Sequence, residues 1–377
     1  MAGLPLAQPF ALWRHKMNMP QNLTMEKLQG AVLQSISNRA ALADRGEISL
    51  TQDLADLHAS GMLAAVVEGT ASGGNVVQGA TLLRRIGRAS LPVGRIVEGH
   101  ANALRLIALY GSPAQMRNAA DLCAQGTIYG VWGAEGKTPV TVTSRAKNNV
   151  VLAGAKQFCS GLGLVTRAVL PVQTDSGPLL VLVNVQDFSR ADPSIWQVSG
   201  MRATASGRYD VTGVDAEILG QPGDYLREPH FEGGIWRYCA LHCGGLEGLA
   251  DAVRRHILAR GQTDDPHQST RMAHMTIHAQ TARLWVNAAS QAVESGYEVD
   301  AAVTQALLAR EAVEQACVAG IALAERSLGT AAFDINSDAD RIRRDLAFFM
   351  RQANLDGKLS VAARQILASP TAVGEMW

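Results

Sequence analysis

The stretch AAVTQALLAREAVEQACVAGIALAERS, residues 301–327, decides the architecture of the C-terminal part of the chain. An apolar stripe of Val313, Cys317, Ile321, Ala324 and, just beyond the stretch, Leu328 repeats every three or four positions. This spacing places side chains on one face of an α-helix. The stretch therefore predicts one long helix with an apolar face that has to be covered.

Three further stretches have the same helical pattern. They are residues 240–260, 269–295 and 339–351. Long helices joined by short connections pack antiparallel into a bundle. The sequence therefore predicts a four-helix bundle over residues 231–377.

The middle of the chain has a different hydrophobic pattern, because its apolar residues come in short β-branched runs separated by polar turns. The run 179–185 is interrupted only by Asn184, so we expect a strand that is buried on both faces. The other runs are 140–143, 150–152, 169–172, 209–211 and 214–218. Strands this close together predict a small barrel or sandwich over residues 126–230.

Residues 1–125 complete the organisation, since from about residue 25 they again have helical spacing with breaks at glycine and proline. We therefore predict a mainly α protein with a β-barrel middle domain, an α+β class. Its three parts are a helical N-terminal domain at 1–125, the barrel at 126–230 and the bundle at 231–377.

Composition excludes several classes of protein. The chain has 377 residues, of which 47% are hydrophobic and 18% charged, which excludes a mainly disordered protein. The 34 basic residues balance 34 acidic ones, so no overall basic field favours nucleic acid or an anionic membrane. No apolar run approaches the ~20 residues of a membrane span, and we find no signal peptide. These features, with five unpaired cysteines, predict a cytoplasmic protein with reduced thiols.

The chain lacks the common motifs of nucleotide, metal and hydrolytic sites, including a dinucleotide-binding glycine pattern and a P-loop. Cys239, His242 and Cys243 lie close together, but a second ligand pair is missing, and we interpret the cysteines as buried packing thiols. His100 is interpreted as a hydrogen-bonded structural histidine. We predict no metal site.

Four local sequences, in the order helices, β module and bundle, resemble the acyl-CoA dehydrogenase superfamily over about residues 28–367. They are YGVWGAEG at 129–136, GAKQFCSG at 154–161, GMRATASGRYDVTGV at 200–214 and GTAAFDINSDADRIRRD at 329–345. In that family a helical domain, a β-barrel and a four-helix bundle enclose FAD. The resemblance therefore implies FAD and an oxidoreductase that transfers hydride to flavin N5.

The resemblance also implies cofactor-binding residues. The 129–136 segment lines the pyrimidine end of the flavin, Phe158 covers one face of the ring and Ser160 directs a hydroxyl to N5. Arg260 corresponds to an arginine that reaches the pyrophosphate, and the Gly329-Thr330 turn receives the FAD of a neighbouring subunit. The implied set is Val131, Trp132, Phe158, Cys159, Ser160, Arg260, Gly329 and Thr330.

The family's catalytic base has no counterpart. The usual glutamate position is occupied by Ala353, or by Gln352 if the segment is one residue shorter, and neither accepts a proton. A second family position, on the first bundle helix, is Tyr238. The nearby acids are Asp356, Glu232 and Glu247. No catalytic residue is assigned.

Three functions stay open on this basis. The first is a dehydrogenase with a displaced base, acting on an acyl-CoA or a related small substrate. The second is a flavin-dependent monooxygenase or oxidase, and the third is a catalytically silent flavin-binding homologue. The resemblance implies a homodimer or homotetramer, and the apolar stripe of residues 313–321 also needs a surface to cover it.

Overall fold

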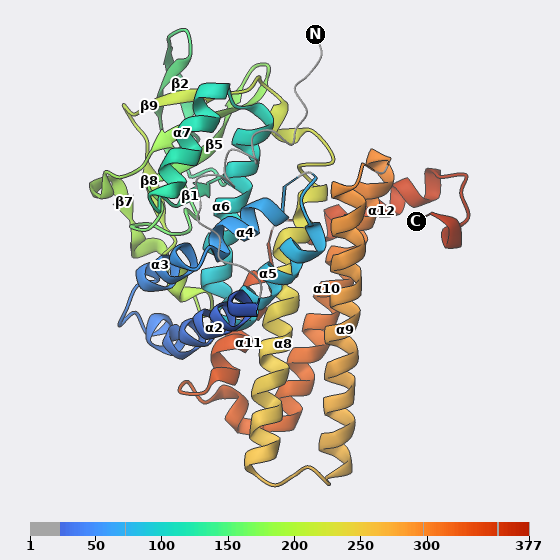
Figure 1. The fold of residues 1–377 in the computed structure, drawn as a ribbon. Helices are drawn as coiled ribbons and strands as arrows, with labels where there is room; N and C mark the ends of the chain where they lie inside the picture. The colour runs from blue at the N-terminus through green and yellow to red at the C-terminus, as the bar shows by residue number, and fades with distance from the viewer. Residues whose placement is uncertain (1–22, 72, 297, 353, 377) are drawn as a thin grey trace.

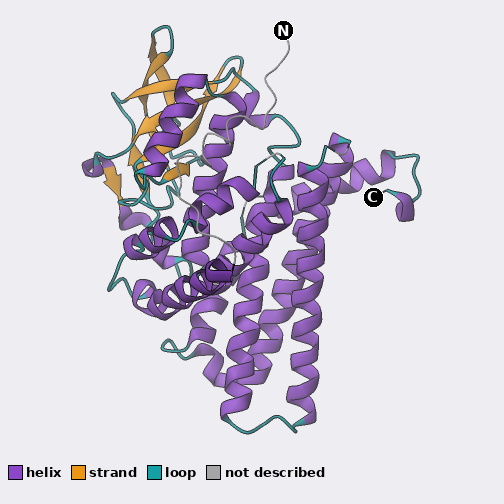
Figure 2. Cartoon of the chain, viewed as in Figure 1, coloured by secondary structure: helices purple, strands orange, loops and turns teal. Residues whose placement is uncertain are grey.

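The computed structural model describes residues 23–71, 73–296, 298–352 and 354–376. The strands gather at one end of the molecule, and long helices run from there to the other end (Figures 1 and 2). None of the described helices is long and apolar enough to cross a membrane.

The N-terminal part is helical, and short polar side chains mark several helix starts. Asn75 accepts a hydrogen bond from the Gln78 N–H, and Ser90 accepts one from the Val93 N–H, so each satisfies a donor that the helix leaves open. The helices are α2 (Leu23–Asp44), α3 (Thr51–Ala59), α4 (Met62–Gly69), α5 (Val76–Ala89), α6 (Leu91–Tyr110) and α7 (Pro113–Ala124).

The β module consists of two sheets. A six-stranded sheet has the order β1-β5-β6-β9-β3-β2, and a three-stranded sheet has the order β4-β8-β7. Apart from the parallel pair of β1 and β5, the paired strands run antiparallel. The strands are β1 (Tyr129–Val131), β2 (Thr141–Arg145), β3 (Asn149–Ala153), β4 (Ala155–Lys156), β5 (Arg167–Thr174), β6 (Gly177–Asn184), β7 (Ala191–Asp192), β8 (Arg208–Asp210) and β9 (Asp215–Leu219). The predicted burial of residues 179–183 on both faces is confirmed in β6.

The C-terminal part is a bundle of long helices. They are α8 (Trp236–Ala259), α9 (Pro266–Glu294), α10 (Val299–Leu328) and α11 (Asp338–Phe349), followed by α12 (Leu355–Ala368). The predicted helices are confirmed, and the fold class with them, while the exact domain boundaries stay predictions. Asp265 and Ser337 cap α9 and α11 with side-chain oxygens.

The apolar stripe of α10 is covered inside the chain. Val313 and Cys317 are fully buried, and the Cys317 thiol lies 3.8 Å from the carbonyl oxygen of His242 on α8. The expectation that this stripe needs another subunit is therefore wrong, because α8 and α9 already cover it. Cys239 and Cys243 are also buried, as packing thiols should be.

Helices α5 and α8 contact each other through their backbones. A Cβ on Gly244 of α8 would lie 2.0 Å from the carbonyl oxygen of Arg84, and one on Gly87 of α5 would lie 2.7 Å from that of Leu241. Only glycine allows this approach. We call this contact the glycine seam, and it joins the N-terminal helices to the bundle.

Candidate functional site

Three chain segments meet around Ser160. They are β1 with the loop after it, the 154–161 segment and the turn at 200–206. The Trp132 indole N–H donates to the Ser160 carbonyl oxygen at 3.1 Å, and the Ser206 hydroxyl donates to Ser160 Oγ at 3.2 Å. The second contact lets the Ser160 hydroxyl donate its own proton to a ligand.

Lys156 ties two of these segments together. Its side chain is fully buried, forms an ion pair with Glu135 and donates to the Pro171 carbonyl oxygen at 2.6 Å. Burial lowers the pKa of Lys156, and the hydrogen bond to Glu135 acts against that shift. A buried charge needs such a partner. The lysine of the 154–161 motif therefore has a structural role, because it fixes the loop after β1.

Phe158 is held outward by a strained backbone. It is 58% exposed, and its φ of +52° lies in the left-handed region that non-glycine residues rarely adopt. Its ring centroid lies 6.2 Å from that of Trp196, which in turn lies 5.5 Å from Phe348 of α11. Cys159 beside it is buried. Strain of this kind is typical of ligand-contacting positions.

His100 holds β1 in place. The Tyr129 N–H donates to His100 Nδ1 at 3.1 Å, and the ring is 2% exposed. Burial lowers the pKa of His100 to about 3, so the ring is neutral and accepts this hydrogen bond at neutral pH. The predicted structural role of His100 is confirmed.

A cleft of about 310 Å³ opens beside Val131, between α6, the loop after β1, residues 225–235 and the start of α8. A wider groove of about 580 Å³ between α2, α5, α8 and α11 contains none of the residues of the three segments, so we take the smaller cleft as the site. The cleft is lined by Arg95, Glu98, Asn102, Arg105, Leu106, Leu109, Val131, Gly133, Ala134, Tyr225, His230, Phe231, Gly234, Ile235, Arg237 and Tyr238.

One wall of the cleft is a polar stripe on α6 that the sequence analysis missed. It consists of Arg95, Glu98, Asn102 and Arg105. Glu98 forms an ion pair with Arg95 and accepts a hydrogen bond from the Asn102 amide. The spacing of three and four residues was the available signal, since it places these polar residues on one face of an otherwise apolar helix.

A second buried cluster joins the end of this stripe to the start of α8 and to α9. Arg105 and Arg237 both contact Glu294 of α9, at 2.6 and 2.8 Å. His230 Nδ1 lies 3.1 Å from Arg105 Nη2. Burial and the charge of Arg105 lower the pKa of His230 to about 4, so this ring is neutral and accepts the hydrogen bond.

The structure constrains the search for a base. Tyr238 lines the cleft, and burial raises its pKa. Gln352 is half-buried after α11, whereas Ala353 lies outside the described residues. Of the three candidate acids none lines the cleft. They are Glu232, which pairs with Lys358, Glu247, which pairs with Arg84 at 2.6 Å, and Asp356, which is exposed in the first turn of α12.

The structure does not bring all predicted cofactor residues together. Val131, Trp132, Phe158, Cys159 and Ser160 belong to the converging segments. The remaining three, Arg260, Gly329 and Thr330, are exposed at the opposite end of the bundle, at the ends of α8 and α10 (Figure 1). Within one chain these two groups therefore cannot contact the same part of a ligand.

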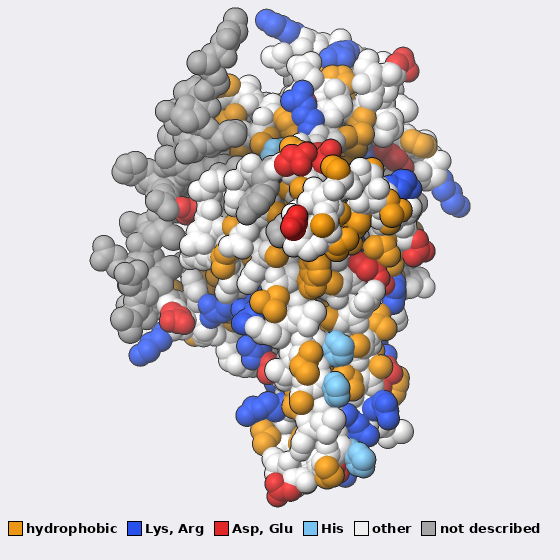
Figure 3. Space-filling view, turned by 90° about the vertical axis from the view of Figure 1, so that its right-hand side faces the viewer, with side chains coloured by type: hydrophobic (Ala, Val, Ile, Leu, Met, Phe, Trp, Pro, Cys, Tyr) orange, Lys and Arg blue, Asp and Glu red, His pale blue; other side chains and the backbone are white. Residues whose placement is uncertain are grey.

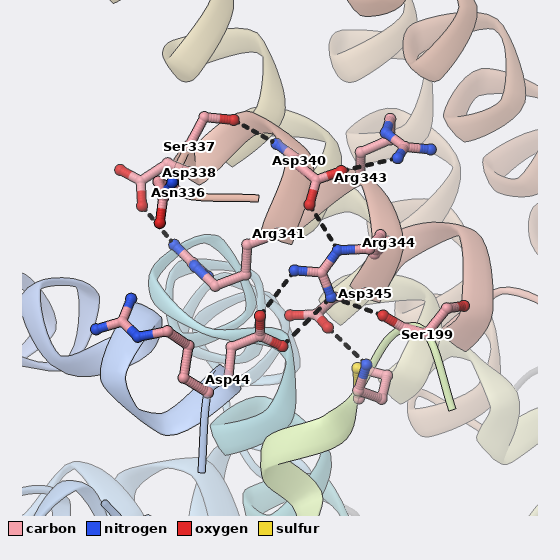
Figure 4. Close-up of polar contacts among 12 residues, drawn as sticks. Asp44, Ser199, Asn336, Ser337, Asp338, Asp340, Arg341, Arg343, Arg344 and Asp345 are labelled. Carbon is pink, nitrogen blue, oxygen red and sulfur yellow. Dashed lines mark hydrogen bonds and ion pairs between the residues drawn. The ribbon is translucent and has the colours of Figure 1, made fainter. Parts of the chain in front are cut away.

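The Arg344-Asp345 pair in the middle of α11 anchors the turn at 200–206 (Figure 4). Arg344 pairs with Asp44 and Asp340, each at 2.7 Å, and donates to the Ser199 carbonyl oxygen at 2.6 Å. Asp345 accepts the Met201 N–H at 2.5 Å. Complete burial raises the pKa of Asp345 to about 6. Arg344 and Asp345 therefore hold the turn at 200–206 in position without contacting the cleft.

Comparisons with known proteins agree on the fold. A scan of protein-family models finds no match, and a search of curated proteins finds no similar sequence. The butyryl-CoA dehydrogenase of Megasphaera elsdenii is 14% identical, with a TM-score of 0.76 over 93% of this chain and all of that one.

Two other solved structures are equally similar. The dibenzothiophene monooxygenase TdsC from Paenibacillus sp. A11-2 is 17% identical, with a TM-score of 0.77 over 94% of this chain and 100% of that one. KijD3, in complex with FMN and a dTDP-amino-keto-sugar, is 15% identical, with a TM-score of 0.76 over 93% of this chain and 96% of that one. At these identities the likeness establishes the fold.

Proposed function

Because the chain has the acyl-CoA dehydrogenase fold, we propose that it is a flavin-dependent oxidoreductase whose flavin ring lies against Phe158 and Ser160. The substrate then occupies the cleft beside Val131. One observation supports this proposal. Two consecutive residues at the end of β1 contact the two proposed positions, one the substrate cleft and the other the segment proposed to hold the flavin ring. Val131 lines the cleft, and Trp132 donates its indole N–H to the Ser160 carbonyl oxygen.

The residues present suit a flavin. A bound flavin supplies a two-electron acceptor, and the chain contributes the surroundings. The exposed ring of Phe158 offers an apolar face that keeps water from one side of a planar ligand. The Ser160 hydroxyl, supported by Ser206, offers a hydrogen-bond donor beside it.

For the cofactor's identity we propose FAD, in a homodimer or homotetramer. Arg260, Gly329 and Thr330 are exposed at the far end of the bundle, where a guanidinium and a turn can receive the adenylate end of a neighbour's FAD. Figure 3 shows apolar side chains scattered over the exposed surface of the bundle. The bundle helices carry exposed apolar residues, which include Ile277 and Leu284 on α9 and Val318 on α10. Such a surface suits contact with a second copy.

Two reactions are compatible with this site. The first is dehydrogenation of an acyl thioester or a related small substrate. Glu98 is the only carboxylate among the described residues that line the cleft, and its two oxygens are engaged by Arg95 and by the Asn102 amide. The second is a monooxygenase or oxidase reaction, which Gln352 and Tyr238 favour, because it needs no carboxylate base at either position.

The test starts with the purified protein as it is expressed. We expect a yellow protein that releases FAD, identified by chromatography against FMN. A colourless protein that binds neither FAD nor FMN on reconstitution would refute the proposal. Anaerobic titration with acyl-CoAs of graded length then separates the reactions. Bleaching of the flavin supports dehydrogenation, whereas oxygen uptake with reduced flavin and no bleaching supports the second candidate.

A further inference from the structure

The cleft beside Val131 is lined by more positive than negative side chains. Arg95, Arg105 and Arg237 line it, whereas Glu98 is the one carboxylate among the lining residues that the structure describes. A pocket for an unbranched acyl chain needs apolar walls instead, because an ionised group in contact with a hydrocarbon chain loses hydration.

In the ion pairs among the described residues, two carboxylates serve these three cations. Glu98 forms an ion pair with Arg95. Glu294 on α9 forms ion pairs with both Arg105 and Arg237. The five groups therefore carry one excess positive charge. Farther acids are engaged elsewhere: Glu232 pairs with Lys358, Asp224 pairs with Arg227, and Glu228 accepts the N–H groups of residues 232 and 233.

Arg237 has one donor that the described residues leave unsatisfied, although its Nη groups also donate to the carbonyl oxygens of Gly234 at 3.3 Å and Thr70 at 3.5 Å. Its side chain is 3% exposed, and its Nε has no hydrogen-bond partner although it is buried. Burial, together with the charge of Arg105, lowers the pKa of Arg237 to about 10. Gly234 keeps the space beside it open, since a Cβ there would lie 2.8 Å from Arg237 Nη1. A buried guanidinium with an unsatisfied N–H is costly unless a ligand completes it.

Neutral polar groups complete the lining. The buried Asn102 Oδ1 has no partner among the described residues, and the Tyr225 side chain also lines the cleft. His230 is engaged with Arg105. These groups allow a ligand to make hydrogen bonds beside the arginines without adding negative charge.

We propose that this cleft binds an anionic group of the substrate, a carboxylate or a phosphate, through Arg237 and Arg95, with Arg105 and Glu294 holding Arg237 in position. A guanidinium binds either anion through paired N–H donors. The inference rests on the proposed function only in taking this cleft as the substrate cleft. It narrows the substrate class to anionic molecules and excludes a plain hydrocarbon chain as the group that occupies this cleft.

The test compares ligands that differ in one charged group. Succinyl-CoA and butyryl-CoA differ by a terminal carboxylate in place of a methyl group. The same acyl pair on N-acetylcysteamine lacks the phosphates of CoA. Binding to the flavin-loaded protein is measured by isothermal titration calorimetry, and the flavin absorption spectrum is recorded in parallel.

We expect succinyl thioesters to bind at least about tenfold more tightly than butyryl thioesters on both carriers if the anion is a carboxylate. If it is a phosphate, both CoA thioesters bind equally and more tightly than their N-acetylcysteamine counterparts. In either case Arg237→Met and Arg95→Met should remove most of the preference. Arg84→Met, which removes an arginine outside the cleft that is about as buried as Arg95, should keep it.

Three results would overturn the inference: equal binding of all four thioesters, no binding of any, or a preference that survives both Arg237→Met and Arg95→Met. Circular dichroism identifies a variant that fails to fold, and Arg95, which is 22% exposed, is the safer of the two to replace. Charge-dependent binding to a protein that holds no flavin would instead refute the proposed function and leave this inference standing.

Discussion

Replacing Gly200 by alanine inserts a methyl group between the turn at 199–201 and α11. A Cβ on Gly200 would lie 2.0 Å from the Arg344 carbonyl oxygen and 2.9 Å from the Asp345 nitrogen, whereas ordinary contacts are 3.4–4 Å. Both neighbours are helix backbone, so the turn has to move and the 2.5 Å bond from the Met201 N–H to Asp345 lengthens. We expect the free energy of unfolding to fall by about 3 kcal/mol, since overpacking and an unsatisfied buried acceptor each cost about 1–3 kcal/mol.

Urea unfolding followed by circular dichroism measures this loss, and flavin retention reports whether it reaches the site. Gly30→Ala is the matched control, because a Cβ on Gly30 in α2 has nothing within 4 Å. That variant should be neutral or up to ~1 kcal/mol more stable. If Gly200→Ala unfolds at the same urea concentration as the wild type, the packing of this turn against α11 is not what the structure indicates.

Three further predictions concern the site and its support. Phe158→Ala should weaken flavin retention by about 1–3 kcal/mol through lost apolar contact, whereas Phe188→Ala, at another exposed phenylalanine, should not; equal retention in both contradicts the placement of the ring. Ala353→Glu should create flavin bleaching by acyl-CoA, on the order of 10²–10⁴-fold over wild type, and rapid bleaching by the wild type would show that another base exists. Asp345 should make the protein more stable as pH falls from about 6 towards 4, because its pKa of about 6 in the folded protein exceeds the ordinary 3.8. This contribution to stability is lost as pH rises through 6. Asp345→Asn should flatten that part of a pH–stability curve, and an unchanged curve would contradict the raised pKa.

The fold could be predicted from the sequence because its elements are long and strongly periodic. The apolar stripe around Val313 and the burial of residues 179–183 each needed one local pattern, and both predictions hold. The helix ends were less accurate. α9 begins at Pro266, since Asp265 caps it, and this capping signal was overlooked. α12 was missed although Leu355, Leu359, Ala362 and Ile366 have helical spacing, and of its side chains only Ala362 is buried.

The site could be predicted only in part. The polar stripe at positions 95, 98, 102 and 105 was visible as a spacing on α6, but its neighbours were not. Glu294 lies 189 residues from Arg105 along the chain, and nothing in either local sequence indicates that they pair. Similarly, Glu232 is a plausible base in sequence, and only the structure shows that Lys358 holds it. Contacts of this kind depend on the register between helices, which a single sequence does not encode locally.

The glycine seam has a consequence for how fast ligands leave. Because α5 and α8 touch through their backbones, they move as one body, and α6 is joined to α5 through the Ser90 cap. The two helices that carry Arg95 and Arg237 are thus fixed relative to each other before any ligand arrives. Binding to a preorganised cleft costs little free energy for ordering its side chains. Differences in affinity between anionic ligands of equal charge should therefore appear in their residence times, with association rates that are nearly equal.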